Sequence, residues 1–477
     1  MTLNTALEPT SAQTETLQIP NTMREVQVDS DDTRRRPKVV ARLNDWQYVE
    51  RSIQRLICGW GRGFTEWNDI VKCHEHVYQQ SECVRRLRER LQEFPGSVNN
   101  LEAPVSGQLE RLCNTVLEAP SFEDAVDGIY SLLLGALTRS YAIYSQVTHP
   151  VHDAPTTAML HQIVTTKETM RLWHHEYRRR RPHVTDAAYK ARVLRNLAAC
   201  DDLLKAIPVS DDDVAQSAGV RSNFRVPPRP ADIAGSRPVP GIMPYLKADF
   251  ASSVETRRLF WAFAYMREMH LAIDQLRWIY DGYYMPWEWT HDVSRHLWDE
   301  SRHGNSGYSR LLDFGITISE IGFEPYDGKI EETTLEPMTR EQLYRTVYSI
   351  GLVAETGHFV VKREAYDDFK AGGDMESAEM MLFDIIDETA HVQYAHRWLP
   401  LLAEHAGVDC SGYKEQAVRE RDQIQRDRDE NDKKFAEEEA DQSSDAYRLY
   451  QELLERMRKI QPLTNAATCP KRSPLPM

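Results

Sequence analysis

Two short stretches, Asp299-Glu300-Ser301-Arg302-His303 and Asp387-Glu388-Thr389-Ala390-His391, share one pattern and decide how this chain is interpreted. A single glutamate precedes each stretch, Glu268 before the first and Glu355 before the second. Residues three positions apart lie on one face of an α-helix, so each Glu-x-x-His pair can hold a metal ion from one side. The sequence therefore predicts two units, each with a glutamate on one helix and a Glu-x-x-His pair on the next.

The spacing within each unit agrees with the geometry of a helical hairpin. Residues level with each other on two antiparallel helices lie about equally far from the turn that joins them. The midpoint of the first unit falls at Tyr284, close to Pro286, and proline cannot continue a helix. The midpoint of the second unit falls between Ala371 and Gly372, again at a helix breaker. Both turns are therefore expected at positions that bring the single glutamate and the Glu-x-x-His pair of each unit level with each other.

Four carboxylates that converge in a protein core need compensating charge. They would repel one another and would lose their hydration if the site held no cations. Two divalent metal ions would neutralise them, so the repeated arrangement predicts a dinuclear metal site. A further Glu-x-x-His pair, Glu288 and His291, lies against the proline turn and is interpreted as a coincidence.

The pattern resembles the signature of the ferritin-like, carboxylate-bridged di-iron proteins. That group includes bacterial hydrocarbon monooxygenases, the radical-generating subunit of ribonucleotide reductase, acyl desaturases and arylamine N-oxygenases. The first stretch matches in full, whereas the second has Ala390 where the signature often has arginine. The resemblance covers about 160 of the 477 residues. It implies an all-α chain whose ferritin-like four-helix bundle carries the dinuclear site.

The candidate metal ligands are Glu268, Glu300, His303, Glu355, Glu388 and His391. Carboxylates and imidazoles suit iron(II) or manganese(II) better than copper(I) or a structural zinc ion, which prefer thiolates. The resemblance implies that Asp299 and Asp387 accept the outer N–H of a metal-binding histidine on a neighbouring helix and so fix its orientation.

His358 is a candidate seventh ligand. It lies three residues after Glu355, so the two side chains share a helix face. The alternatives are a histidine hydrogen-bonded to Asp299 or Asp387, or an ordinary core histidine.

Composition limits the class of protein. The net charge of −15 disfavours nonspecific nucleic-acid binding. Seven scattered cysteines without a Cys-x-x-Cys pair are typical of reduced thiols, and no apolar run has the length of a membrane span. A cytoplasmic protein that binds neither nucleic acid nor membrane is therefore expected.

Breaks in helical periodicity divide the chain. The predicted segments are a disordered tail (1–38), an N-terminal helical domain without metal ligands (39–206), a Pro-rich connection (207–250), the di-metal bundle (251–408), charged C-terminal helices (409–460) and a second tail (461–477). The connection is interpreted as an interdomain strap, with a lid over the bundle as the alternative.

The N-terminal domain contains a hairpin that could be a degenerate copy of the ferritin-like unit. Its predicted helices cover 121–148 and 156–180, and Glu168 occupies the place of a ligand. The positions level with Glu168 on the other helix of this hairpin are Gly135 and Ala136, whose side chains cannot bind a metal. We therefore expect no metal site in this half of the chain.

Three classes of function remain. The leading prediction is a non-haem di-iron oxygenase or oxidase that uses O2 to oxidise a small organic molecule, with an electron donor and a second copy of the chain as candidate partners. The alternatives are iron or manganese storage with ferroxidase activity, and a non-catalytic metal-binding bundle. Storage ferritins are short chains, so the long N-terminal region of this chain favours an enzyme.

Overall fold

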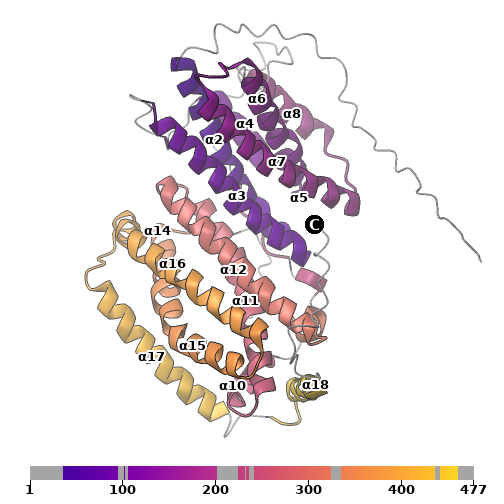
Figure 1. Cartoon of the computed structure of the whole chain (residues 1–477), viewed down its shortest axis with the longest axis vertical. Coiled ribbons are helices and arrows are strands. Elements are labelled where there is room, and N and C mark those ends of the chain that lie inside the picture. The colour runs from indigo at the N-terminus through magenta and orange to yellow at the C-terminus, as the bar shows by residue number, and fades with distance from the viewer. Residues whose placement is uncertain are drawn as a thin grey trace, which may run out of the picture.

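The computed structural model describes residues 36–94, 101–102, 106–200, 224–230, 233–235, 241–323, 335–435 and 441–459, and its regular elements are helices (Figure 1). Within those ranges, β-type pairing is limited to an isolated antiparallel bridge between Val226 and Leu335. The prediction of an all-α chain is confirmed. None of the described helices contains a stretch that is both long and apolar enough to cross a membrane.

The N-terminal half forms its own group of helices, drawn in indigo and magenta in Figure 1. They are α2 (Arg36–Trp60), α3 (Trp67–Gln92), α4 (Gly107–Leu117), α5 (Phe122–Val126), α6 (Leu134–Val147), α7 (Ala154–Arg180) and α8 (Ala187–Ala199). A 3-10 turn, η1 (Gly61–Gly63), follows α2, and a π-helical stretch, η2 (Asp127–Leu133), joins α5 to α6. Side chains of Ser106, Ser121 and Asp186 accept backbone N–H groups at the starts of α4, α5 and α8, which satisfies donors that the helices leave unpaired.

Four long helical segments follow, and we call them the central helices. They are α11 (Val254–Asp281), α12 (Trp287–Asp313), the continuous run of α14 (Arg340–Tyr348), η4 (Ser349–Ala354) and α15 (Glu355–Ala371), and α16 (Met375–Ala406). The first hairpin turns where expected, because Pro286 is the N-cap of α12. Helix α12 therefore starts at Trp287, directly after the proline. Gly373, with φ of +76°, makes the second turn in the left-handed region that favours glycine.

Shorter helices and the charged C-terminal helices cover the central helices. They are α10 (Met243–Ala248), the 3-10 turn η3 (Ile233–Gly235), α13 (Ile318–Ile321), α17 (Tyr413–Lys434) and α18 (Asp445–Lys459). Helix α17 lies along η4 and α15 in Figure 1, and Arg421 donates a 3.2 Å hydrogen bond to Thr356. The apolar stripe of α18 is buried at Leu453, Leu454 and Met457.

The two predicted tails and much of the Pro-rich connection lie outside the described residues, apart from the last residues of the first tail. Helix α2 already begins at Arg36, so residues 36–38 belong to a helix. In the described part of the connection, the Phe224 ring packs against Trp60 of the N-terminal group and Tyr280 of α11, with ring centroids 5.0 and 5.7 Å apart. This part of the connection therefore contacts both halves of the chain.

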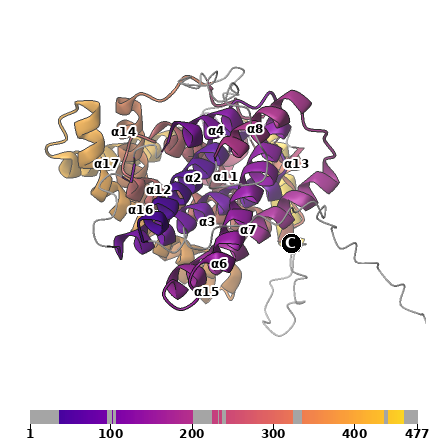
Figure 2. The same cartoon turned by 90° about the horizontal axis from the view of Figure 1, so that it is seen from above.

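One apolar core runs through both halves of the molecule. Helices α2 and α3 pack against α11 and α12, and Figures 1 and 2 show the two groups in direct contact. Hydrogen bonds that cross this contact include those from Gln54 to Ser294 (2.7 Å) and from Trp67 to Asn305 (2.9 Å). The N-terminal helices are therefore part of the support for α11 and α12, the helices that carry the first predicted Glu and Glu-x-x-His unit.

Candidate metal centre

Eight side chains from the four central helices converge in the interior, and we call them the carboxylate–histidine cluster. Its members are Glu268 of α11, His296, Glu300 and His303 of α12, Glu355 of α15, and Asp384, Glu388 and His391 of α16. Seven of the eight are buried, and Glu268 is partly exposed. All six residues predicted as metal ligands from the sequence belong to this cluster.

The donor atoms of the cluster fall into overlapping groups, and within each group every atom lies within 4.8 Å of the others. The groups are His296, Glu300, Glu355 and His391; Glu268, His303 and Asp384; and Glu300, His303 and Glu388. Because Glu300 and His303 recur in more than one group, the groups are neighbours in space. The arrangement has the donor types and closeness that two adjacent metal ions require.

Asp299 and Asp387 orient the two histidines of the predicted motifs. His303 donates through Nε2 to Asp387 (3.2 Å), and His391 donates through Nε2 to Asp299 (3.3 Å). Burial opposes ionisation of Asp299, but hydrogen bonds from His391 and Arg302 lower its pKa to about 2. Each hydrogen bond joins α12 to α16, as the resemblance implied. The inner nitrogen, Nδ1, of each histidine consequently faces the cluster.

Many polar atoms of the cluster are buried and make no hydrogen bond of regular geometry. They are Nδ1 of His303 and His391, Oε2 of Glu268 and Glu388, both carboxylate oxygens of Glu355, and both carboxylate oxygens of Asp384. The nearest charged groups to most of them are other members of the cluster, and Asp384 Oδ2 also lies 2.6 Å from the ammonium group of Lys362. Buried polar atoms in folded proteins are almost always hydrogen-bonded, so such a concentration of exceptions needs an explanation. Divalent metal ions would satisfy these oxygen and nitrogen donors, and the residues therefore fit a dinuclear site.

The pKa values of the cluster also indicate that its carboxylates need compensating positive charge. Burial raises the pKa of Glu388 well above its ordinary value and raises that of Glu268 to about 7, although 21% of the Glu268 side chain is exposed. Burial opposes protonation of His391, but hydrogen bonds to Asp299 and Glu300 raise its pKa to about 10. Protons thus neutralise part of the carboxylate charge, and metal ions would displace them on binding.

Sequence reasoning missed three residues of this centre. His296 and Asp384 lie four positions before Glu300 and Glu388, so each adds a donor one turn before a Glu-x-x-His pair. Residues four positions apart also share a helix face, so this spacing is a sequence signal for both residues that the Glu-x-x-His pattern alone does not include.

The third missed residue is Lys362 of α15, whose side chain is 3% exposed. Its Nζ lies 2.6 Å from Asp384 Oδ2 and 2.7 Å from Glu388 Oε1. The ammonium group and two divalent ions would together balance the five carboxylates of the cluster. A lysine has no motif of its own, so only the fold reveals this role.

The remaining sequence candidates lie elsewhere. His358 lines the cavity beside the cluster but belongs to none of the three donor groups found in the described residues. His291 pairs with Ser81 (2.9 Å), outside the cluster. In the N-terminal half, Glu168 pairs with Arg171 on the surface (2.7 Å), and none of the described residues there forms a donor group.

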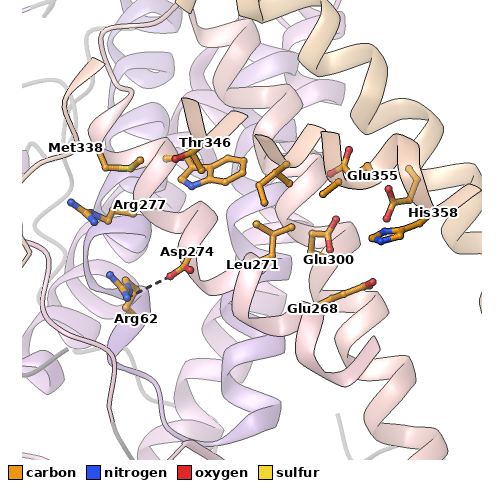
Figure 3. Close-up of a pocket in the computed structure, with 14 residues that line it drawn as sticks. Arg62, Glu268, Leu271, Asp274, Arg277, Glu300, Met338, Thr346, Glu355 and His358 are labelled. Carbon is orange, nitrogen blue, oxygen red and sulfur yellow. Dashed lines mark ion pairs between the residues drawn. The ribbon is translucent and has the colours of Figure 1, made fainter. Parts of the chain in front are cut away.

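A cavity of about 580 Å³ opens onto the cluster (Figure 3). Figure 3 places Glu268, Glu300, Glu355 and His358 at one end, and Glu388 of the same cluster also lines the cavity. Arg62, Asp274 and Arg277 line the opposite end, Leu271 lies between the two ends, and Trp278 is a further lining residue. A volume of this size is within the range of small-molecule sites.

No protein-family model, curated protein or solved structure matches this chain. The functional interpretation therefore rests on the residues and geometry described above.

Proposed function

We propose that the carboxylate–histidine cluster holds two iron ions and that the protein is an O2-dependent oxidoreductase of the ferritin-like di-iron type. The observation that carries this proposal is the convergence of histidine Nδ1 atoms and carboxylate oxygens from four helices in three overlapping groups, within each of which the donor atoms lie within 4.8 Å of one another. The donor set suits iron(II), with manganese(II) as the other candidate metal. Such a pair of ions would supply electrons for the reduction of O2.

The residues of the chain have separate tasks in this proposal. Asp299 and Asp387 hold His391 and His303 with Nδ1 directed at the metals, which keeps the ligands in place when the charge at the site changes. Arg295 and Arg302 pair with both aspartates and keep them ionised. The cavity next to the cluster would admit a small organic substrate and limit the access of water.

Metal stoichiometry tests the site. Full-length protein reconstituted anaerobically with Fe(II) should bind about two ions per chain, because two donor groups of three or more ligands lie side by side. Glu388→Ala should lose the dinuclear site and keep most of the helical circular-dichroism signal. Glu168→Ala removes an exposed glutamate of the N-terminal half and should leave the metal content unchanged. One ion or none in correctly folded wild-type protein would contradict the assignment.

Oxygen consumption separates an enzyme from a storage protein. An oxygenase or oxidase should keep its two irons through turnover and consume O2 in proportion to an organic substrate. A storage protein should instead accumulate tens of irons per chain as a mineral, with no dependence on substrate. The cavity beside the cluster favours the enzyme, since storage needs no site for an organic molecule.

A further inference from the structure

The cavity beside the cluster is elongated, because two helical segments line it along their length. Helix α11 contributes Glu268, Leu271, Asp274, Arg277 and Trp278, and the facing run of α14, η4 and α15 contributes Thr346, Ile350, Ala354, Glu355 and His358. These positions recur every three or four residues, so each wall is a single helix face. From position 268 to position 277, the helical rise is about 13 Å.

The lining changes in character along this length. The inner end contains carboxylates that belong to the proposed metal site, and Leu271 lies between this end and Asp274 (Figure 3). Trp278 and Ile350 add further apolar lining. At the outer end, two guanidinium groups, Arg62 and Arg277, face a single lining carboxylate, Asp274. The lining of the outer end thus presents two guanidinium groups and one carboxylate, and a second carboxylate, Asp281, pairs with Arg277 outside the lining. The N–H donors of the two guanidinium groups suit an anionic group on the ligand.

The two arginines are held in place by the fold. Arg62 comes from η1 of the N-terminal half, its side chain is 2% exposed, and its Nη2 lies 3.6 Å from Asp274. Arg277 pairs with Asp281 (3.2 Å) and donates to the backbone carbonyl of Glu336. Asp274 is 56% exposed, so its carboxylate can turn to solvent when another anion approaches Arg62. Guanidinium groups present several N–H donors in a fixed fork, which suits a carboxylate.

We propose that the cavity binds an elongated, mostly apolar molecule with one carboxylate, and that this carboxylate lies at Arg62 and Arg277. The apolar body then lies along Leu271, Trp278 and Ile350, and the end remote from the carboxylate reaches the cluster. The oxidation of that end rests on the proposed di-iron function, whereas binding depends only on the cavity. The N-terminal half thereby contributes to substrate recognition through Arg62.

The test compares decanoate with decan-1-ol and decyltrimethylammonium as probes. Calorimetric titration uses the full-length protein, both metal-free and loaded with redox-inactive zinc. Decanoate should bind at least about ten-fold more tightly than the alcohol in both forms, because a charge-assisted hydrogen bond contributes at least that factor. The ammonium probe should bind most weakly. Equal affinities for decanoate and the alcohol would overturn the proposal.

Substitutions then locate the carboxylate. Arg277→Met should remove most of the preference for decanoate over the alcohol, and Arg62→Lys should reduce it while retaining the buried charge. Arg345→Met is the matched control, because Arg345 pairs with Glu341 on the exposed face of α14, away from the cavity. A preference that survives Arg277→Met and occurs only in zinc-loaded protein would place the carboxylate on the metals and refute the proposed orientation.

A third variant tests the path of the apolar body. Ile350→Trp fills the middle of the cavity, so decanoate should lose affinity while the shorter acid butanoate is affected little. Equal losses for both acids would show that the ligand does not extend past Ile350. Reconstitution of the same protein with Fe(II) separates the two proposals. Two irons per chain without any preference for decanoate refute the present inference alone, whereas a preference for decanoate in protein that takes up no iron refutes the di-iron function alone.

Discussion

At the scale of single residues, Lys362 adds a fixed positive charge to one side of the carboxylate–histidine cluster. Its ammonium group contacts Asp384 and Glu388, on the side where Glu268 and His303 also lie. Among the described residues, the ion pairs of Glu300 and Glu355 in the other donor group are made with His296 and His391, and none is made with a lysine. A cation on the first side would therefore experience the stronger repulsion, and the two metal positions should differ in affinity.

The expected consequence is stepwise metal binding. At an effective dielectric constant of about 20, a monovalent and a divalent charge about 5 Å apart repel each other by several kcal/mol. Lys362→Met should therefore raise the affinity for the weaker of the two ions by at least about ten-fold, measured by competition with a chelator. Lys167→Met is the control, since Lys167 is also fully buried and pairs with Glu50 (2.6 Å) in the N-terminal half. Two equal affinities in the wild type would contradict this role.

Two buried histidines of α3 should make the protein sensitive to acid. Burial lowers the pKa of His74 to about 3, and burial also lowers that of His76 to about 3. Above pH 6.5 both are neutral in the folded and unfolded states, but below it the unfolded chain takes up protons that the folded chain excludes. The stability is therefore lost as the pH falls from about 6.5 towards 3. At pH 5 the loss is about 2 kcal/mol for each histidine.

This acid sensitivity is checked by urea unfolding of metal-free protein at pH 7 and pH 5. His74→Phe should reduce the loss of unfolding free energy between these pH values by about 2 kcal/mol, because one titrating group is removed. His161→Phe alters an exposed histidine of α7 and should leave the pH dependence as in the wild type. An unchanged pH dependence in His74→Phe would show that His74 is not held neutral by burial.

At the scale of elements, glycines allow α11 and α12 to approach closely at the cluster. A Cβ at Gly304 would lie 2.9 Å from the backbone nitrogen of Met269, and one at Gly307 would lie 2.3 Å from that of Met266. These two glycines therefore serve close packing of the two helices. Close packing also fixes Glu268 relative to Glu300 and His303.

Gly307→Ala should therefore force α11 and α12 apart. We expect a decrease in unfolding free energy of about 1–3 kcal/mol, typical of an overpacked interior, and weaker metal binding. Gly135→Ala is the matched control, because the nearest atom to its added Cβ is 4.0 Å away at the end of Arg139. That change should be neutral or slightly stabilising, since alanine favours helix. Equal effects of the two substitutions would contradict the packing role.

The π-helical stretch η4 shapes the wall of the cavity directly before Glu355. Its wider turn changes the angular register between α14 and α15. Thr346 and Ile350 can therefore face the same cavity as Glu355 and His358. Gly351 lies in this stretch, and a Cβ there would meet Ala395 of α16 at 2.6 Å. Close contact with α16 thus accompanies the irregular helix.

At the scale of the whole molecule, the continuous core predicts that the central helices do not fold alone. A fragment that begins at residue 241 would expose the faces of α11 and α12 that α2 and α3 cover, including the buried Trp287, whose ring lies under the guanidinium group of Arg88 of α3. We expect the fragment to bind a hydrophobic dye and to unfold without a cooperative transition, because an exposed apolar face of this kind favours loose packing. Cooperative unfolding together with two bound metals would instead establish an independent domain.

The sequence by itself determined the helical class, the turns at Pro286 and Gly372, and the six residues that meet in the cluster. These features are local, because helix periodicity and helix breakers act over a few residues. Only the tertiary structure decided which side chains oppose one another across the interior. Lys362 enters between Asp384 and Glu388, and Arg62 reaches a cavity whose other walls lie more than 200 positions away in the sequence. Such contacts depend on how helix faces pack. The spacing of residues within one helix does not identify the helix that packs against it.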